Sequence, residues 1–172
     1  MDTQFASDSG DLLETVRALD ADSTARGILI LTASASSPQP DNLDPLLRDL
    51  SVPVFGGVFP EILHNGEKSD TGSVVARLDL EPDVTVVPGL SDPDTQFDQL
   101  PEEVPNGGTA FVLVDAFADR IQDFVSSLFH TYGVDLAYIG GGAGSLEEGQ
   151  RPCLFTNQGV VQDAAVLATV DT

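Results

Sequence analysis

The stretch YIGGGAGS, residues 138–145, contains four glycines within five positions. It begins inside a short apolar run, residues 136–139, which predicts a buried strand. Because glycine weakens a strand, these glycines indicate a turn that needs a positive φ angle or the close approach of another group. Backbone N–H groups in such a turn form a concave site for an anion such as a carboxylate or phosphate. A tight turn that only lets strands pack closely is the structural alternative, and it is compatible with binding.

The residues that follow these glycines exclude two nucleotide-binding motifs. A phosphate-binding loop places a lysine directly after its last glycine, and none stands there in this sequence. The dinucleotide fingerprint continues into a helix that faces a pyrophosphate, and residues 146–152, LEEGQRP, do not have that pattern.

A second glycine pair, Gly56 and Gly57, follows the apolar run at residues 52–55. The same order of elements is predicted around both glycine sites: strand, helix, strand, glycines, a hairpin with an Asn in its turn, and a final strand. The half-repeats cover about residues 26–87 and 109–171. The turn-rich connector between them, about residues 88–108, is expected to lie over the surface.

These patterns predict an α/β fold. It is expected to be a single domain, residues 1–172, of two pseudo-repeated strand-helix-strand-hairpin halves with mixed β-sheets. Any two α/β halves look alike at this level, but the coinciding glycine pairs and asparagines favour a duplication. Two halves that each bury one sheet face poorly alone would pack into one core.

The charge balance is unusual, because 28 acidic residues stand against 7 basic ones and give a formal net charge of −21. The acidic residues are scattered between apolar runs, which indicates an acid-coated folded surface rather than a disordered tail. Such a surface is typical of salt-adapted, haloarchaeal-type proteins, in which molar salt shortens the Debye length to about 3 Å. No basic patch favours nucleic acid, and no apolar segment is long enough for a membrane span. The polar N-terminus is not a secretory signal, so a cytoplasmic protein is expected.

Residues 139–145 and 151–167 resemble the closing segment of the N-terminal domain of the FIST family. The shared pattern is a glycine-rich turn, a short strand, a hairpin of the Asn-Gly type and a strand of small residues. The run VFGG at residues 54–57 resembles the first glycine turn of that domain, and the similarity extends over about residues 26–170. Its motifs are mostly glycine and apolar residues, without a chemical signature.

The resemblance implies a sensory, signal-transducing domain that binds a small ligand, such as an amino acid or small carboxylate. It also implies a partner, either a C-terminal FIST domain or a histidine-kinase-type signalling protein. The sequence stops just after its last predicted strand, so we expect either a stand-alone protein or a fragment that lacks the C-terminal domain.

The ligand is expected where the two glycine sites converge. The predicted ligand-binding residues are Gly56, Gly57, Phe59, Gly140, Gly141, Gly142, Ala143, Gly144, Ser145, Arg151 and Asn157. In an arginine-poor chain, Arg151 beside the glycines can bind a ligand carboxylate with two hydrogen bonds. An ion pair with Glu147 or Glu148 is the structural alternative.

The chain has little catalytic equipment. His64 and His130 have no companions at metal-ligand spacing, and no cofactor or metal is expected. Cys153 is expected to be a buried, inert thiol, and Ser145 lacks a nucleophile-elbow motif. We therefore expect no enzyme. A small hydrolase or transferase that uses Ser145 or Cys153 is one alternative function, and a non-catalytic protein-interaction module is the other.

Overall fold

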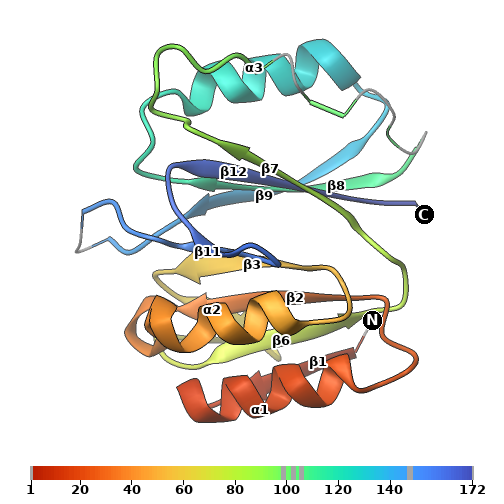
Figure 1. Cartoon of the computed structure of the whole chain (residues 1–172), viewed down its shortest axis with the longest axis vertical. Coiled ribbons are helices and arrows are strands. Elements are labelled where there is room, and N and C mark those ends of the chain that lie inside the picture. The colour runs from red at the N-terminus through yellow and green to blue at the C-terminus, as the bar shows by residue number, and fades with distance from the viewer. Residues whose placement is uncertain (1, 98–99, 102–103, 105–106, 147–148, 172) are drawn as a thin grey trace.

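Two β-sheets packed face to face form the framework of the chain (Figure 1). The computed structural model describes all residues except 1, 98–99, 102–103, 105–106, 147–148 and 172. The elements are β1 (Asp2–Ala6), α1 (Ser9–Asp20), β2 (Gly27–Ala33), the 3₁₀ turn η1 (Ser34–Ser36), α2 (Pro40–Asp49), β3 (Val54–Phe59), β4 (Ile62–His64), β5 (Glu67–Ser69), β6 (Ser73–Leu78), β7 (Asp83–Pro88), β8 (Thr109–Asp115), α3 (Ile121–Tyr132), β9 (Ala137–Ala143), β10 (Leu154–Thr156), β11 (Gly159–Val161) and β12 (Ala164–Val170).

The first sheet has the strand order β1-β6-β2-β3-β10-β11, and the second has the order β7-β12-β8-β9. Within them only β2–β3 and β8–β9 pair in parallel, and the other pairs are antiparallel. The hairpin β4–β5 forms a small sheet of its own. The predicted α/β fold with mixed sheets is therefore confirmed.

Helices cover the outer face of each sheet, so the layers run α3, second sheet, first sheet, then α1 with α2 (Figure 1). Strand β12 shows why its residues are apolar throughout. Ala164, Val166 and Ala168 face the first sheet, while Ala165 and Leu167 face α3 and the connector. Between the sheets, the rings of Phe55 and Phe111 lie 5.2 Å apart.

The four strands β1-β6-β2-β3 correspond in order and direction to β7-β12-β8-β9. The sheets do not follow the predicted boundaries of the half-repeats, because β7, which the sequence places in the first half, pairs with β12 in the second sheet. Its counterpart β1 precedes the predicted first half. A duplication stays a prediction. The two hairpins differ, because β10–β11 extends the first sheet and β4–β5 joins neither large sheet.

The prediction that the glycines form turns was wrong. Gly56 and Gly57 lie inside β3, and residues 140–143 lie inside β9. Gly56 has φ +159° opposite Ile30, and Gly140 has φ +153° opposite Val112. A Cβ atom on either glycine would overlap the carbonyl oxygen of that partner residue, so glycine is required within these strands.

The connector between the half-repeats contributes to the core instead of only crossing the surface. Leu90, Phe97 and Leu100 are buried against α3 and the second sheet. The Arg120 guanidinium lies 4.9 Å from the centre of the Phe97 ring and donates to the carbonyl of Asp92 at 2.6 Å. The connector thus covers the part of the sheet that α3 leaves open.

Candidate ligand cleft

A polar cleft of about 540 Å³ opens at the carboxyl end of the parallel pair β2–β3. Ligands of open α/β sheets commonly bind at this end of parallel strands. The lining residues are Ser34, Ala35, Ser37, Pro38, Gln39, Pro40, Val58, Gly144, Ser145, Arg151, Pro152 and Cys153. The cleft is large enough for a small metabolite.

One wall is the segment that connects β2 to α2. Hydrogen bonds fix it to neighbouring elements, since Ser36 Oγ accepts from Gly72 N at 2.8 Å and Ser9 Oγ donates to Ser36 O at 3.3 Å. Helix α2 begins at Pro40, which lines the cleft. The positive end of the α2 dipole therefore lies at this wall, where it favours a negative ligand group.

The other wall is formed by Gly144, Ser145 and residues 151–153, and hydrogen bonds attach it to Val58 of β3 at two points. Gly144 N donates to Val58 O at 2.7 Å, and Val58 N donates to Cys153 O at 2.8 Å. These bonds place Ser145 and Arg151 over the end of the β2–β3 pair. The cleft thus lies between a segment of the first half-repeat and a segment of the second.

A buried carboxylate supports this second wall from behind. Asp115, at the end of β8, accepts from Asp163 N at 2.7 Å, Gln150 Nε2 at 2.9 Å and Phe117 N at 3.0 Å. Gln150 directly precedes Arg151 of this wall, so Asp115 links the wall to β8 and to the turn before β12. Asp115 is not among the residues predicted from the sequence, where its only signal is an acid at the end of the apolar run FVLV.

The thiol of Cys153 lines the cleft but is almost fully buried. Burial, and secondarily the charge of Asp115, raises the pKa of this thiol to about 12. The thiolate is the nucleophilic form of cysteine. Since the thiol stays protonated near neutral pH, this geometry disfavours Cys153 as a nucleophile.

The structure brings together only part of the predicted site. Gly144, Ser145 and Arg151 line the polar cleft. Phe59 and residues 140–142 instead line a separate apolar groove of about 490 Å³. The other lining residues of this groove are Leu29, Leu31, Phe55, Glu61, Ile62, Leu63, Phe111, Leu113 and Ile139.

The remaining predicted residues pack inside the fold. Gly56, Gly57 and Ala143 are buried, and a Cβ atom on Gly57 would lie 3.1 Å from the Cβ of Ala143. Asn157 lies at the opposite end of β3 from the cleft. There its Oδ1 accepts from Val54 N at 2.9 Å, and its Nδ2 donates to Val52 O at 3.1 Å. The structure therefore gives Asn157 the role of attaching the β10–β11 hairpin.

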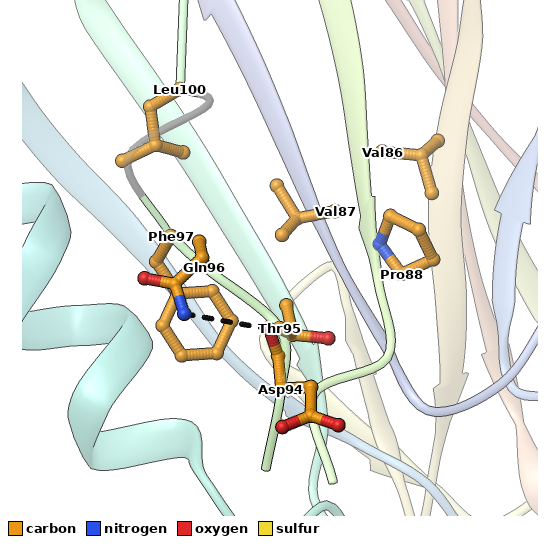
Figure 2. A pocket seen from close by; sticks show the side chains of 8 residues that line it. All are labelled: Val86, Val87, Pro88, Asp94, Thr95, Gln96, Phe97 and Leu100. Atoms are coloured by element: carbon orange, nitrogen blue, oxygen red, sulfur yellow. Dashed lines mark hydrogen bonds between the residues drawn. The ribbon is translucent and has the colours of Figure 1, made fainter. Parts of the chain in front are cut away.

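A further cavity, of about 340 Å³, lies between β7 and the connector (Figure 2). Its wall combines apolar side chains such as Val87 and Leu100 with the polar side chains of residues 94–96. Asp94 is its only charged lining residue among those described, so this cavity suits a carboxylate ligand less well than the polar cleft does.

The described residues include no group of three or more His, Cys, Asp or Glu side chains that could hold a metal ion. Within the same residues, no helix has both the length and the apolar character needed to cross a membrane.

The chain is thus a layered α/β domain with a polar cleft at the carboxyl end of β2–β3. The FIST N domain family model matches residues 27–172, and the chain therefore belongs to the FIST family. FIST domains are sensory domains implicated in signal transduction, and the family is not a known catalytic one. No curated protein sequence gives a significant match to this chain.

Proposed function

We propose that this FIST domain is a sensory module that binds an amino acid or another small carboxylate in the polar cleft. The observation that carries the proposal is the convergence of Arg151, serine hydroxyls and the α2 N-terminus at the carboxyl end of β2–β3. Gly144, Ser145 and Arg151, which the sequence predicts as ligand-binding residues, all line this cleft.

Electrostatics favour a carboxylate at this position. A guanidinium binds a carboxylate through two parallel hydrogen bonds, and the α2 dipole adds a positive field. The chain as a whole carries a formal charge of −21 and repels anions. Arg151 therefore provides a local positive charge at the cleft that attracts an anionic ligand. High salt would screen the repulsion between that ligand and the acidic surface of the protein. A salt-adapted cytoplasmic protein, as the composition predicts, would meet this condition.

A ligand in the cleft would contact both half-repeats. Ser34 and Ser37 follow β2 of the first half, whereas Ser145 and Arg151 follow β9 of the second. A ligand shifts a conformational equilibrium only by its difference in affinity for the two states. We propose that binding between these walls favours one arrangement, which a C-terminal FIST domain or a histidine-kinase-type partner would detect.

The alternative of a hydrolase or transferase has less support. Among the described residues, the lining of the cleft contains neither His64 nor His130, so Ser145 has no histidine base there. The Cys153 thiol has a pKa raised to about 12. A binding function needs neither group to be activated.

Binding can be tested by a thermal-shift screen of amino acids and small carboxylates in molar potassium chloride. At a hundredfold excess over Kd, a ligand stabilises the native state by about 2.7 kcal/mol. We expect a selective, saturable shift that Arg151→Ala abolishes. The matched control is Arg17→Ala, which removes the same charge from an exposed position on α1 and is expected to keep the shift. The proposal fails if a well-folded sample responds to no compound, or if both variants lose the response equally.

A further inference from the structure

We propose that the β4–β5 hairpin closes onto the open edge of β9 in a second conformation of this domain. Closure would extend the second sheet to the order β7-β12-β8-β9-β4-β5. This order corresponds strand by strand to β1-β6-β2-β3-β10-β11 in the first sheet. The inference goes beyond the proposed ligand function and does not require it.

The first sheet shows how a hairpin closes such an edge. Strand β10 runs antiparallel to β3, with Leu154 opposite Gly57, Phe155 opposite Gly56 and Thr156 opposite Phe55. All three β10 residues are buried. The hairpin thus covers the outer edge of the strand that holds the first glycine pair.

The equivalent edge of β9 is open. Strand β9 pairs with β8 on one side, and no strand among the described residues pairs with its other side. Residues 140–142 are exposed, and the Ile139 side chain is 57% exposed. Exposed apolar strand edges favour pairing with another strand.

The two glycine sites show the difference directly. A Cβ atom on Gly57 would lie 3.0 Å from Cys153 O and 3.5 Å from Leu154 Cδ2, because the hairpin packs against this glycine. A Cβ atom on Gly141 would have no atom within 4 Å. Gly141 therefore lacks the contacts that the β10 hairpin and its preceding residue make with the equivalent glycine of β3.

The β4–β5 hairpin is suitably placed to supply such contacts. It is joined to β3 by residues 60–61 only, and Glu61, Ile62 and Leu63 line the same apolar groove as residues 139–142. Leu63 is 72% exposed although it is a large apolar side chain. The short link keeps the hairpin beside its target, which gives a high effective concentration for closure.

Gly56 and Gly140 occupy equivalent positions in β3 and β9, each opposite a residue of its parallel partner strand. This equivalence defines which residues would pair in the closed state. Pairing like that of β10 places Ile62 opposite Gly141, Leu63 opposite Gly140 and His64 opposite Ile139. Closure buries the exposed side chains of Leu63 and Ile139. It releases Ile62 from its cluster with Ala33 and Val74 and breaks the stacking of His64 on Phe5. Contacts are therefore exchanged rather than only gained, as expected for two interchangeable states.

Disulfide trapping tests this register. In the double variant His64→Cys/Ile139→Cys, closure brings the two new thiols directly opposite each other, within the distance that a disulfide requires. Under mild oxidation in molar potassium chloride, we expect a monomer with an internal disulfide. The native thiol of Cys153 is buried and has a pKa raised to about 12, so it stays out of exchange.

The matched control is Glu67→Cys/Ile139→Cys. Glu67 lies on β5, opposite His64, and is one strand farther from β9 in the closed state. We expect its disulfide to form at least about tenfold more slowly, because its Cβ distance is too long. Adding Gly141→Trp to the His64→Cys/Ile139→Cys variant should slow trapping by a similar factor, since the indole occupies the space that β4 needs.

Two results would overturn the proposal: a disulfide that links two chains, or equal trapping in the control pair. Hydrogen exchange on the unmodified protein provides an independent measurement. Closure predicts partial protection of the amides of Gly140 and Gly142, which face the open edge. The amide of Gly141 faces β8, since the carbonyl of Ala143 on the same side of the strand accepts from Ala116 N. Exchange of the Gly140 and Gly142 amides at the rate of an unstructured peptide would also contradict the proposal.

Discussion

The two β-sheets share the order of four strands, yet only the first continues into a hairpin. That hairpin, β10–β11, comes from the second half-repeat, whereas β4–β5 of the first half-repeat stays beside the open edge of β9. The segments that precede the hairpins differ, since residues 60–61 precede β4 and residues 144–153 precede β10. A common order of elements therefore does not determine which strands pair. The length of the preceding connection limits which strand edge a hairpin can reach. The longer connection, which precedes β10, also contributes residues to one wall of the cleft.

The largest expected effect concerns the glycines that face the parallel partner strands. Gly56→Ala should destabilise the domain by more than about 4 kcal/mol, because Cβ overlaps the carbonyl of Ile30 in a strand paired on both sides. Gly140→Ala should lose less, about 2 kcal/mol, because the edge strand β9 can shift outward. Urea unfolding in molar potassium chloride measures both. The control, Gly141→Ala, should change stability little, and equal losses at residues 56 and 140 would contradict the proposed difference.

The two hairpins give the next contrast. Phe155 on β10 is fully buried, and Phe155→Ala should lower the free energy of unfolding by about 3 kcal/mol. Leu63, its counterpart on β4, is mostly exposed in the open state, so Leu63→Ala should lower it by less than about 0.5 kcal/mol. Unfolding curves of the two variants at the same salt concentration make the comparison. A loss of about 2 kcal/mol at Leu63 would mean that the closed state predominates in solution.

The buried carboxylate at the end of β8 has no counterpart in the first sheet, where β2 ends at Ala33. Asp115→Ala should destabilise by about 2 kcal/mol, because it leaves the backbone amides of Asp163 and Phe117 without their acceptor. The same variant should weaken ligand binding by releasing the segment that carries Arg151. Unfolding and thermal-shift titrations separate the two effects, and unchanged binding would show that the wall keeps its position without Asp115.

The smallest expected effect is a loss of stability at alkaline pH. It should begin at a lower pH for the core between the sheets, which contains Cys153, than for the core under α3, which contains Tyr132. The pKa of Cys153, in the core between the sheets, is raised from 9.0 to about 12, mainly by burial. A raised pKa stabilises the folded state below pH 9, and this contribution is lost as the pH rises toward 12. The loss should be about 1 kcal/mol at pH 10. Burial also raises the pKa of Tyr132, in the core under α3, from 10.0 to about 12, so its contribution is lost from pH 10 upward.

The free energy of unfolding, measured between pH 8 and pH 11, should fall first from about pH 9 because of Cys153 and more steeply above pH 10 because of Tyr132. Cys153→Ala should flatten the slope that begins near pH 9, and Tyr132→Phe should flatten only the part above pH 10. An unchanged slope in Cys153→Ala would contradict the assignment of the first step to this thiol.

Much of the fold follows from apolar periodicity in the sequence. The buried runs at residues 28–31 and 164–170 gave central strands, and the helical spacing of Phe124 and Leu128 gave the buried face of α3. Strand β1 was missed because its sequence, DTQFA, is mostly polar and exposed, and only its pairing with β6 makes it a strand. Local propensity opposes glycine in strands and therefore predicts turns at both glycine sites. The requirement at Gly56 comes from Ile30, on a neighbouring strand, which no local rule includes.

The candidate site was predicted in part for the same reason. Gly144, Ser145 and Arg151 were found because they are near one another in the sequence and in the cleft. The serines that follow β2 were missed, since only the β2–β3 pairing brings them to the opposite wall. The sequence does not distinguish Asp115 from surface acids, because the chain contains 28 acidic residues and most of them are expected on the surface.

The attachment of β10 to β3 has a consequence for the synthesis of the chain. During translation, β2, β3 and β6 leave the ribosome long before the hairpin that completes their sheet, because Phe155, the partner of Gly56, comes much later in the sequence. Such distant pairing slows folding and leaves an apolar strand edge exposed in the nascent chain. The first half-repeat is therefore expected to depend on β10 and β11 to reach its native form. Cutting the chain between the half-repeats would separate β3 from its partner strand, so neither piece is expected to form a native sheet framework alone.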